Sequence, residues 1–145
     1  MIRVVKANTE ELKEKAFQIR AEVFVDEQKV SREDEFDEFE KSSHHFVVLD
    51  EADEPVGAAR WRVTPKGIKL ERFAVKSNRR GNKIGSSLVL SALSDIRQHK
   101  GSGNYLYLHA QLTAIGLYAK YGFQKKGDIF TECDIEHYLM ELQDE

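Results

Sequence analysis

One long amphipathic stretch, predicted as a helix over residues 83–99, lies between two short strand-like runs. Apolar side chains recur in it at four-residue spacing from Ile84 to Ile96, which places them on one helix face. The flanking runs, 68–75 and 105–110, have the length and apolar composition of strands. A strand, a helix of this length and a second strand form a crossover connection, so we expect these two strands to be parallel.

The strand-like runs before the crossover follow one another with short polar turns, which favours an antiparallel meander. Two further helices and three further strands complete the pattern, and Gly122 is suited to the left-handed end of the second of these helices. The predicted segments are strands at 1–6, 45–49, 56–63, 68–75, 105–110, 123–126 and 138–142, and helices at about 9–25, 83–99 and 112–121.

These segments predict an α+β fold, or α/β by a looser convention, with a mixed, mostly antiparallel central sheet and helices on both faces. No internal repeat and no Pro- or Gly-rich linker interrupts the 145 residues, so we expect a single domain over 1–145.

The composition excludes several classes of protein. A net charge of -3 argues against a general nucleic-acid binder. The opening residues lack the apolar core of a signal peptide, and no run reaches the roughly 18 to 20 apolar residues of a membrane span, so we expect a cytoplasmic protein without membrane contact. A single cysteine, Cys133, excludes an internal disulfide and is interpreted as structural.

The segment Asp26–Glu40 is strongly acidic, with eight carboxylates and two basic residues. It fits a solvated acidic loop or frayed helix. It also fits a rim that attracts a cationic substrate. Phe36 and Phe39 argue against a fully exposed loop, because such a loop rarely contains two phenylalanines.

The loop between the strand ending at Val75 and the long helix is strongly basic. Four Lys or Arg side chains and no acid occur in residues 76–83. A helix start exposes unpaired N–H groups and the positive end of the helix dipole, and Gly81 and Gly85 let an anion approach the main chain closely. The spacing is neither that of an ATP-type P-loop nor that of a dinucleotide-binding loop. The alternative is a turn with solvated charge.

This loop resembles the acyl-coenzyme A signature of the GNAT superfamily of N-acetyltransferases, [Q/R]-x-x-G-x-[G/A]. Arg80 matches the first position and Gly85 the last, whereas Lys83 stands where the middle glycine is usual. The resemblance implies that the loop amides bind the pyrophosphate of the coenzyme and that the preceding strand pairs with its pantetheine arm. The implied coenzyme-binding residues are Phe73, Ala74, Val75, Arg80, Gly81, Asn82, Lys83, Ile84, Gly85, Ser86 and His109.

The similarity extends over about 120 residues in the same order, and it indicates the ElaA/YjcF-like branch. It implies a parallel pair of strands around the coenzyme site and, because many similar proteins pair through sheet edges or C-terminal strands, a homodimer. The motifs are Arg20-x-x-Val23-Phe24-Val25-x-Glu27-Gln28, His45, Gly57-x-x-Arg60, Glu71-Arg72-x-x-Val75, His109-Ala110-Gln111, Tyr118-x-x-x-Gly122-Phe123, Glu132, Ile135 and His137.

Two side chains are the candidate catalytic residues. Tyr118 takes the position where similar acetyltransferases often place a tyrosine beside the coenzyme sulfur, and a phenol can protonate a thiolate of similar basicity. The other interpretation of Tyr118 is a core aromatic on a helical stripe. Glu71, on the strand that leads into the coenzyme loop, is the preferred base. A structural ion pair of Glu71 with a neighbouring arginine is the alternative.

The resemblance implies an acceptor pocket after the first helix, at Glu27 and Gln28. Arg60 is a candidate for binding an acceptor carboxylate, and its pairing with the acidic segment is the alternative. Adjacent strand residues face opposite ways, so His44 and His45 cannot easily chelate one metal. With no HxxxH or CxxC spacing, we expect no metal.

The leading hypothesis is an N-acetyltransferase that uses acetyl-CoA as cosubstrate and acetylates a primary amine of a small molecule or peptide by direct attack in a ternary complex. The alternatives are a non-catalytic acyl-CoA sensor and a nucleotide or polyanion binder that uses the same basic loop. The fold and loop do not identify the acceptor.

Overall fold

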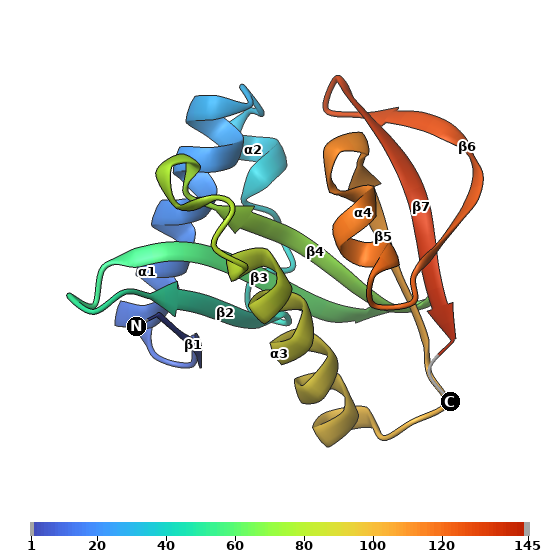
Figure 1. The fold of residues 1–145 in the computed structure, drawn as a ribbon, viewed down its shortest axis with the longest axis horizontal. Helices are drawn as coiled ribbons and strands as arrows, with labels where there is room; N and C mark the ends of the chain where they lie inside the picture. Colours follow the sequence, from blue (N-terminus) through green and yellow to red (C-terminus); the bar gives the residue numbers. More distant parts are fainter. Residues whose placement is uncertain (1, 144–145) are drawn as a thin grey trace.

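The computed structural model describes residues 2–143 and contains one mixed sheet (Figure 1). Its strand order is β1-β2-β3-β4-β5-β7-β6, and only β4 and β5 are parallel. Met1, which the sequence places in the first strand, lies outside the described residues. The strands are β1 (Arg3–Lys6), β2 (His44–Leu49), β3 (Pro55–Thr64), β4 (Gly67–Val75), β5 (Tyr105–Gln111), β6 (Gln124–Glu132) and β7 (Ile135–Gln143).

The helices follow the predicted positions with changes in winding. Thr9 caps the first helix by accepting a hydrogen bond from the Leu12 N–H, as expected of a threonine at this position. That helix becomes a π-helix in its second part, and the predicted helix 112–121 is a 3₁₀ turn followed by a short α-helix. The helices are α1 (Glu10–Arg20), η1 (Ala21–Glu27), α2 (Arg32–Glu35), η2 (Ser77–Arg79), α3 (Ile84–Lys100), η3 (Leu112–Ala114) and α4 (Ile115–Ala119).

Helices α1 and α3 cover opposite faces of the sheet (Figure 1). Side chains alternate along a strand, so Val48 of β2 packs in the core with α3, whereas Val47 packs in the core with α1. The Ile84, Leu88, Ala92 and Ile96 stripe is buried in the first of these cores, as its spacing predicts. The predicted mixed fold with a parallel pair and helices on both faces is confirmed.

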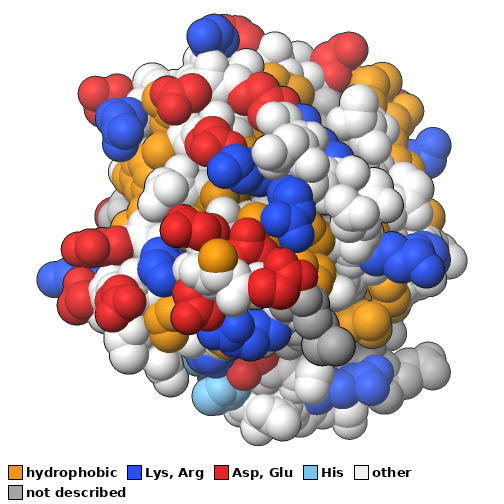
Figure 2. Space-filling view, turned by 60° about the vertical axis from the view of Figure 1, so that its left-hand side comes forward, with side chains coloured by type: hydrophobic (Ala, Val, Ile, Leu, Met, Phe, Trp, Pro, Cys, Tyr) orange, Lys and Arg blue, Asp and Glu red, His pale blue; other side chains and the backbone are white. Residues whose placement is uncertain are grey.

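The acidic segment 26–40 is partly solvated and partly packed: five of its eight carboxylate residues are exposed, whereas Glu35 is buried and Asp37 and Glu40 are half-buried. Glu35 is buried beside Arg20, with its Oε2 2.9 Å from Arg20 Nε. The two phenylalanines face arginines, with Arg20 over the ring of Phe36 and Arg62 over the ring of Phe39. Figure 2 shows one face of the molecule on which carboxylates and basic side chains lie interleaved. The buried Arg20 and Arg60 pair with the three carboxylates that are withdrawn from solvent.

The C-terminal hairpin is longer than the predicted strands 123–126 and 138–142. Strands β6 and β7 meet in a two-residue turn at Cys133 and Asp134, whose φ angles are 51° and 61°. Two consecutive positive φ angles are typical of a type I′ turn, which usually contains Asn or Gly. Cys-Asp lacks that signal, and β6 is mostly exposed and polar, so neither apolar alternation nor turn composition marked this hairpin.

Within residues 2–143, no helix has both the length and the apolar composition that crossing a bilayer requires.

Candidate active site

The parallel strands β4 and β5 separate halfway along their length. Their paired residues are only Ile68–Leu70 with Leu106–Leu108, although β4 continues to Val75 and β5 to Gln111. Beyond Leu70, β4 therefore keeps its hydrogen bonding to β3 on one side and has no strand partner in β5 on the other. The divergence opens the sheet between its two central strands.

A bulge at Arg72 accompanies this divergence. Arg72 has a φ of 61°, and the β3–β4 register shifts between Ala58 and Arg60. A left-handed residue in a strand bends the chain and costs free energy unless its surroundings hold it. The Arg72 guanidinium donates to the main-chain oxygens of Asp34 and Glu35 and lies 3.1 Å from an Asp37 carboxylate oxygen. These contacts to the α2 region hold β4 in its bent course.

The loop after β4 leads to the start of α3, where no side chain caps the helix. Gly81 has a φ of 85°, and no atom lies within 4 Å of the position of its missing Cβ. Lys83, at the position where the family signature has glycine, is itself left-handed with a φ of 62°. The backbone thus takes the conformation that glycine favours without a glycine at this position. The first turn of α3 contains no acidic residue, so it keeps its positive end.

Gly85 makes room for a neighbouring helix rather than for a ligand at the loop. A Cβ at this position would lie 3.1 Å from Leu117 Cδ2, so the glycine lets α3 and α4 approach each other closely. The missing Cβ therefore makes room for Leu117 at Gly85, whereas at Gly81 it leaves the main chain open.

Arg80 ties this loop to the end of η1. Its guanidinium forms two hydrogen bonds to the Glu27 carboxylate, at 2.7 and 2.9 Å, and its Nε donates to the Val75 carbonyl. Glu27, which the sequence assigns to the acceptor, therefore lies against the coenzyme loop and outside the pocket lining. The hydrogen bond from Arg80 lowers the Glu27 pKa, with the arginine's charge adding to it.

A pocket of about 320 Å³ lies where β4 and β5 separate. Its walls come from the end of η1, from α2, from the diverging strands, from α4 and from the C-terminal hairpin. Cys133 at the hairpin tip lies 3.9 Å from an Asp34 carboxylate oxygen, so the hairpin reaches α2 across the pocket. Burial and that carboxylate raise the Cys133 pKa, which is consistent with its structural interpretation and unlike an activated thiolate.

Tyr118 of α4 lines this pocket. Its side chain is 7% exposed and is held edge-on between the rings of Phe73 and Phe123, with centroids 5.7 and 6.2 Å away. Burial raises the Tyr118 pKa above its usual value, so the phenol stays protonated at neutral pH. A protonated hydroxyl in a pocket wall is a potential proton donor.

Glu71 also lines the pocket, but it is tightly paired. Its carboxylate lies 2.8 Å from Arg60 Nη2, 2.5 Å from Arg62 Nε and 3.3 Å from Lys69 Nζ. Burial by itself raises the Glu71 pKa, but these cations outweigh burial and lower the pKa to about 2. A carboxylate this acidic is a weak proton acceptor. Glu71 therefore lies in ion pairs with neighbouring cations, which is the alternative interpretation of this residue.

Arg60, a candidate acceptor-binding residue from the sequence, is fully buried and is not part of the pocket lining. It forms ion pairs with Asp37, Glu40 and Glu71, each at 2.8 or 2.9 Å. Both alternative partners predicted for it, the acidic segment and Glu71, are present. Its surroundings are those of a structural residue.

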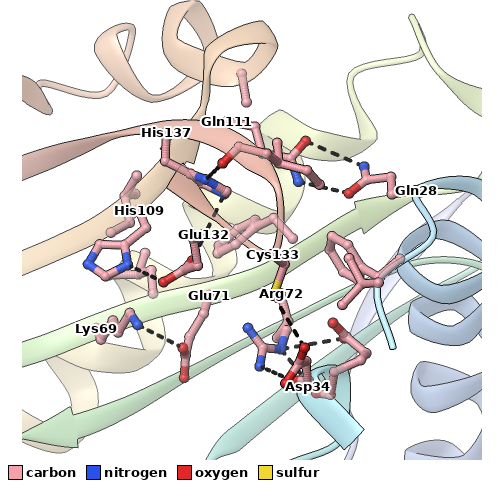
Figure 3. Close-up of a pocket in the computed structure, with 18 of the residues that line it drawn as sticks. Gln28, Asp34, Lys69, Glu71, Arg72, His109, Gln111, Glu132, Cys133 and His137 are labelled. Carbon is pink, nitrogen blue, oxygen red and sulfur yellow. Dashed lines mark hydrogen bonds and ion pairs between the residues drawn. The ribbon is translucent and has the colours of Figure 1, made fainter. Parts of the chain in front are cut away.

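Three side chains from the last three strands meet at the other wall of the pocket (Figure 3). His109 Nδ1 of β5 lies 3.1 Å from Glu132 of β6, and His137 Nε2 of β7 lies 4.0 Å from the same carboxylate. His137 Nδ1 lies 2.7 Å from the Ile135 carbonyl oxygen, so this nitrogen is the donor. The hydrogen bond from His109 lowers the Glu132 pKa, although burial opposes it.

Gln28 lines the pocket beside Gln111, and the two amides exchange hydrogen bonds at 2.9 and 3.4 Å (Figure 3). The π-helical winding of η1 ends at Gln28, whose N–H bonds the carbonyl five residues back. This pair links the end of η1 to the end of β5. Of the three residues predicted at the acceptor site, Gln28 alone lines the pocket.

The structure brings Glu71, Phe73, His109 and Tyr118 together in the lining of one pocket. Glu132 and His137 were missed as site residues, because their place depends on the full length of the hairpin. Phe130-x-Glu132 and Ile135-x-His137 each alternate over only three residues, which is too short a pattern to mark these strand ends.

Comparisons with known proteins agree with this geometry. The family model of the acetyltransferase (GNAT) domain matches residues 7–143. The chain is 38% identical over 141 residues to the uncharacterized N-acetyltransferase YjcF of Bacillus subtilis. The alignment covers 97% of this chain and 98% of YjcF.

Two solved structures share the fold. Escherichia coli ElaA matches with a TM-score of 0.84 at 22% identity, over 97% of this chain and 99% of ElaA. An aminoglycoside 6′-N-acetyltransferase complexed with coenzyme A matches with a TM-score of 0.72 at 18% identity, over 99% of this chain and 96% of that one.

Proposed function

The chain belongs to the GNAT acetyltransferase family, and we propose that it transfers the acetyl group of acetyl-CoA to a primary amine of a small molecule or peptide by direct attack in a ternary complex. The divergence of β4 from β5 carries this proposal. Within residues 2–143, it leaves one edge of the main chain at Phe73–Val75 without a strand partner, and it opens a pocket that the protonated Tyr118 lines.

The start of α3 fits the diphosphate of the coenzyme. Its N–H groups lack a side-chain cap, its first turn has no acid, and Lys76 and Lys83 add positive charge nearby. The aminoglycoside acetyltransferase that shares this fold is complexed with coenzyme A, which supports the assignment. The residues proposed to hold the coenzyme are Phe73, Ala74, Val75, Arg80, Gly81, Asn82, Lys83, Ile84, Gly85 and Ser86.

When bound, acetyl-CoA supplies an acetyl group on a thioester, whose C–S bond breaks as the amine nitrogen forms the new C–N bond. Three proton transfers accompany this exchange of bonds. The amine arrives as an ammonium, and a second group of the protein removes one proton so that the nitrogen can attack. Tyr118 donates a proton to the departing sulfur, since its buried hydroxyl is protonated at neutral pH. The second proton of the nitrogen leaves after the attack and restores the Tyr118 hydroxyl.

We assign this second role to His109 rather than to the expected base, Glu71. Three cations hold the Glu71 carboxylate in its charged form, with a pKa of about 2. His109 lies in the pocket wall with Nδ1 held by Glu132, which fixes the ring and leaves Nε2 to accept a proton. The proposed contact of His109 with the coenzyme is compatible with this role, because the coenzyme and the amine would both bind beside this wall of the pocket.

Two substitutions distinguish these candidate bases. We expect His109→Gln to lower kcat by about 100-fold or more, because general base catalysis typically contributes 10²–10⁴-fold. Glu71→Gln is expected to keep kcat within a few fold and to lower stability instead, because it leaves Arg60 underpaired. Steady-state rates over pH 6 to 9, with urea unfolding of each variant, make the comparison. Loss of kcat in Glu71→Gln without loss of stability would return the base role to Glu71.

The charge of the pocket favours a cationic acceptor. Its lining contains five carboxylates and three Lys or Arg side chains. Most of these carboxylates are paired: Glu35 and Asp37 contact arginines, Glu71 contacts three cations and Glu132 contacts His109. Among the described residues, the Asp34 carboxylate has only the Cys133 thiol beside it, at 3.9 Å. We therefore propose that Asp34 attracts a positive group of the acceptor.

A panel of amines tests the proposed function. Purified protein with acetyl-CoA is expected to release free CoA thiol with primary amines, and fastest with amines that carry a second positive charge. Asp34→Asn is expected to raise KM severalfold for those dicationic amines and to leave KM for monoamines unchanged. Acetyl-CoA binding without thiol release across the panel would indicate the sensor alternative, and equal stabilisation by ATP and acetyl-CoA would indicate a polyanion binder.

A further inference from the structure

A second cluster of potential ligand groups lies away from the pocket, between β2 and the C-terminal half of α3. His44, Asp95 and His99 each direct one donor atom to a common point, and these three atoms lie within 4.8 Å of one another. Asp95 and His99 are four residues apart on α3, so both face the same side of the helix. None of the three lines the pocket of the proposed active site.

The cluster already holds a cation, the ammonium of Lys6. Lys6 Nζ lies 2.5 Å from Asp95 Oδ2, 3.2 Å from His44 Nδ1 and 3.4 Å from His99 Nε2. One positive centre therefore contacts all three potential ligands, which shows that their donor atoms converge on a single position. Lys6 belongs to the edge strand β1 and its side chain is 29% exposed, so the ammonium has a path to solvent.

The distances suit a small divalent ion. Asp95 Oδ1 and His99 Nε2 are 3.4 Å apart. Two ligands of a tetrahedral zinc ion, each about 2.0–2.1 Å from the metal, are about 3.3 Å apart. The Asp95–His99 edge of the site is therefore preformed. The His44 donor atom lies within 4.8 Å of the other two, and it moves inward to complete a face of three ligands when the ion binds. Two imidazoles and one carboxylate are a ligand set that zinc accepts, with water in the fourth position.

Neighbouring groups orient the ligands, as they do in established metal sites. The Trp61 Nε1–H donates to Asp95 Oδ2 at 3.0 Å. The His44 ring is stacked on Trp61, with ring centroids 4.0 Å apart and an angle of 7° between the planes. Trp61 is fully buried, so both orienting contacts are anchored in the core. His99 is the accessible member, with 46% of its side chain exposed.

We propose that His44, Asp95 and His99 form a binding site for Zn²⁺, in which the metal displaces the Lys6 ammonium. The bound ion ties β2 to α3. This assignment departs from the expectation of no metal, which rested on sequence spacing. The ligands come from two elements that the fold brings together, and only Asp95 and His99 are close to each other in sequence.

Zinc titration of untagged protein, freed of metal with EDTA, tests the site. Trp61 is the only tryptophan and touches two of the three ligands, so its fluorescence reports directly on occupancy. We expect a saturable change at one Zn²⁺ per chain, confirmed by calorimetry, and a melting temperature that rises with zinc concentration. His99→Ala is expected to weaken binding at least tenfold, and Lys6→Met to strengthen it about tenfold, because the competing ammonium is removed.

Two controls separate this site from other zinc binding. Gln98→Ala alters the exposed neighbour of His99, and His109→Gln alters the histidine of the pocket; both are expected to bind Zn²⁺ as the wild-type protein does. The proposal is overturned if wild-type protein gives no saturable response up to about 1 mM Zn²⁺, or if His99→Ala binds within twofold of wild type. Loss of binding in His109→Gln alone would move the site to the pocket.

Discussion

Replacing Tyr118 with phenylalanine is expected to lower kcat by about 10²–10⁴-fold, the usual contribution of a positioned general acid, while acetyl-CoA binding stays unchanged. The substitution removes only the hydroxyl. The ring keeps its edge contacts with Phe73 and Phe123, so the pocket wall and the stability of the fold are preserved. The departing sulfur then leaves as an unprotonated thiolate. Rates of thiol release and a calorimetric Kd for acetyl-CoA measure the two effects separately.

Tyr121→Phe is the matched control, because Tyr121 follows the same helix and lies outside the lining of the active-site pocket. We expect kcat of this variant to equal that of the wild-type protein. If Tyr118→Phe turned over at the wild-type rate, the proton donor would be water or another group, and Tyr118 would be a core aromatic. A parallel loss of acetyl-CoA binding would instead indicate that the hydroxyl holds the coenzyme.

The central fold was predictable because its signals are local. The spacing of apolar residues from Ile84 to Ile96 identifies α3, and its length requires the crossover that makes β4 and β5 parallel. The hairpin lacked such signals, since β6 is an exposed polar edge strand and the turn at Cys133 and Asp134 lacks the usual residues. Edge strands bury little apolar surface, so their sequences show weak alternation.

The candidate site was predictable where it depends on order along the chain. The basic loop, Tyr118 and Glu71 follow from motifs, and the structure puts Tyr118 and Glu71 in one pocket. The pairing of individual side chains was not predictable, because it depends on contacts between segments that are distant in sequence. Arg80 pairs with Glu27 across 53 positions of sequence, and His109 meets Glu132 only because β6 returns beside β7. The predicted homodimer and cytoplasmic location stay predictions.

The second large effect is expected from Arg60→Ala, which should lower the free energy of unfolding by about 3–5 kcal/mol. Arg60 is fully buried and forms ion pairs with Asp37, Glu40 and Glu71. Removing the shared cation leaves these carboxylates clustered in a poorly solvated region, where mutual repulsion and desolvation both act against folding. Urea unfolding at pH 7, followed by circular dichroism, gives the difference.

Arg3→Ala is the matched control, because Arg3 pairs with Asp53 at the surface with 53% of its side chain exposed. Such an ion pair contributes about 0–1 kcal/mol, so the loss in free energy of unfolding should be several times larger in Arg60→Ala than in Arg3→Ala. If Arg60→Ala does not fold, Arg60→Lys keeps the charge without the planar guanidinium and should lose an intermediate amount. Equal losses in Arg3→Ala and Arg60→Ala would contradict a central role for the buried network.

The same network predicts how stability depends on pH. Burial raises the pKa values of Glu71 and Asp37, but the arginines outweigh burial and lower both to about 2 in the folded protein, from ordinary values of 4.5 and 3.8. Groups with lowered folded pKa values stabilise the fold fully above their unfolded pKa, and this contribution is lost as the pH falls toward the folded pKa. Wild-type stability should therefore fall between about pH 4.5 and pH 2.

In Arg60→Ala the carboxylates lose the cation that lowers their pKa values, so the fall in stability over this interval should be shallower. An equally steep fall in both proteins would mean that other carboxylates control acid unfolding.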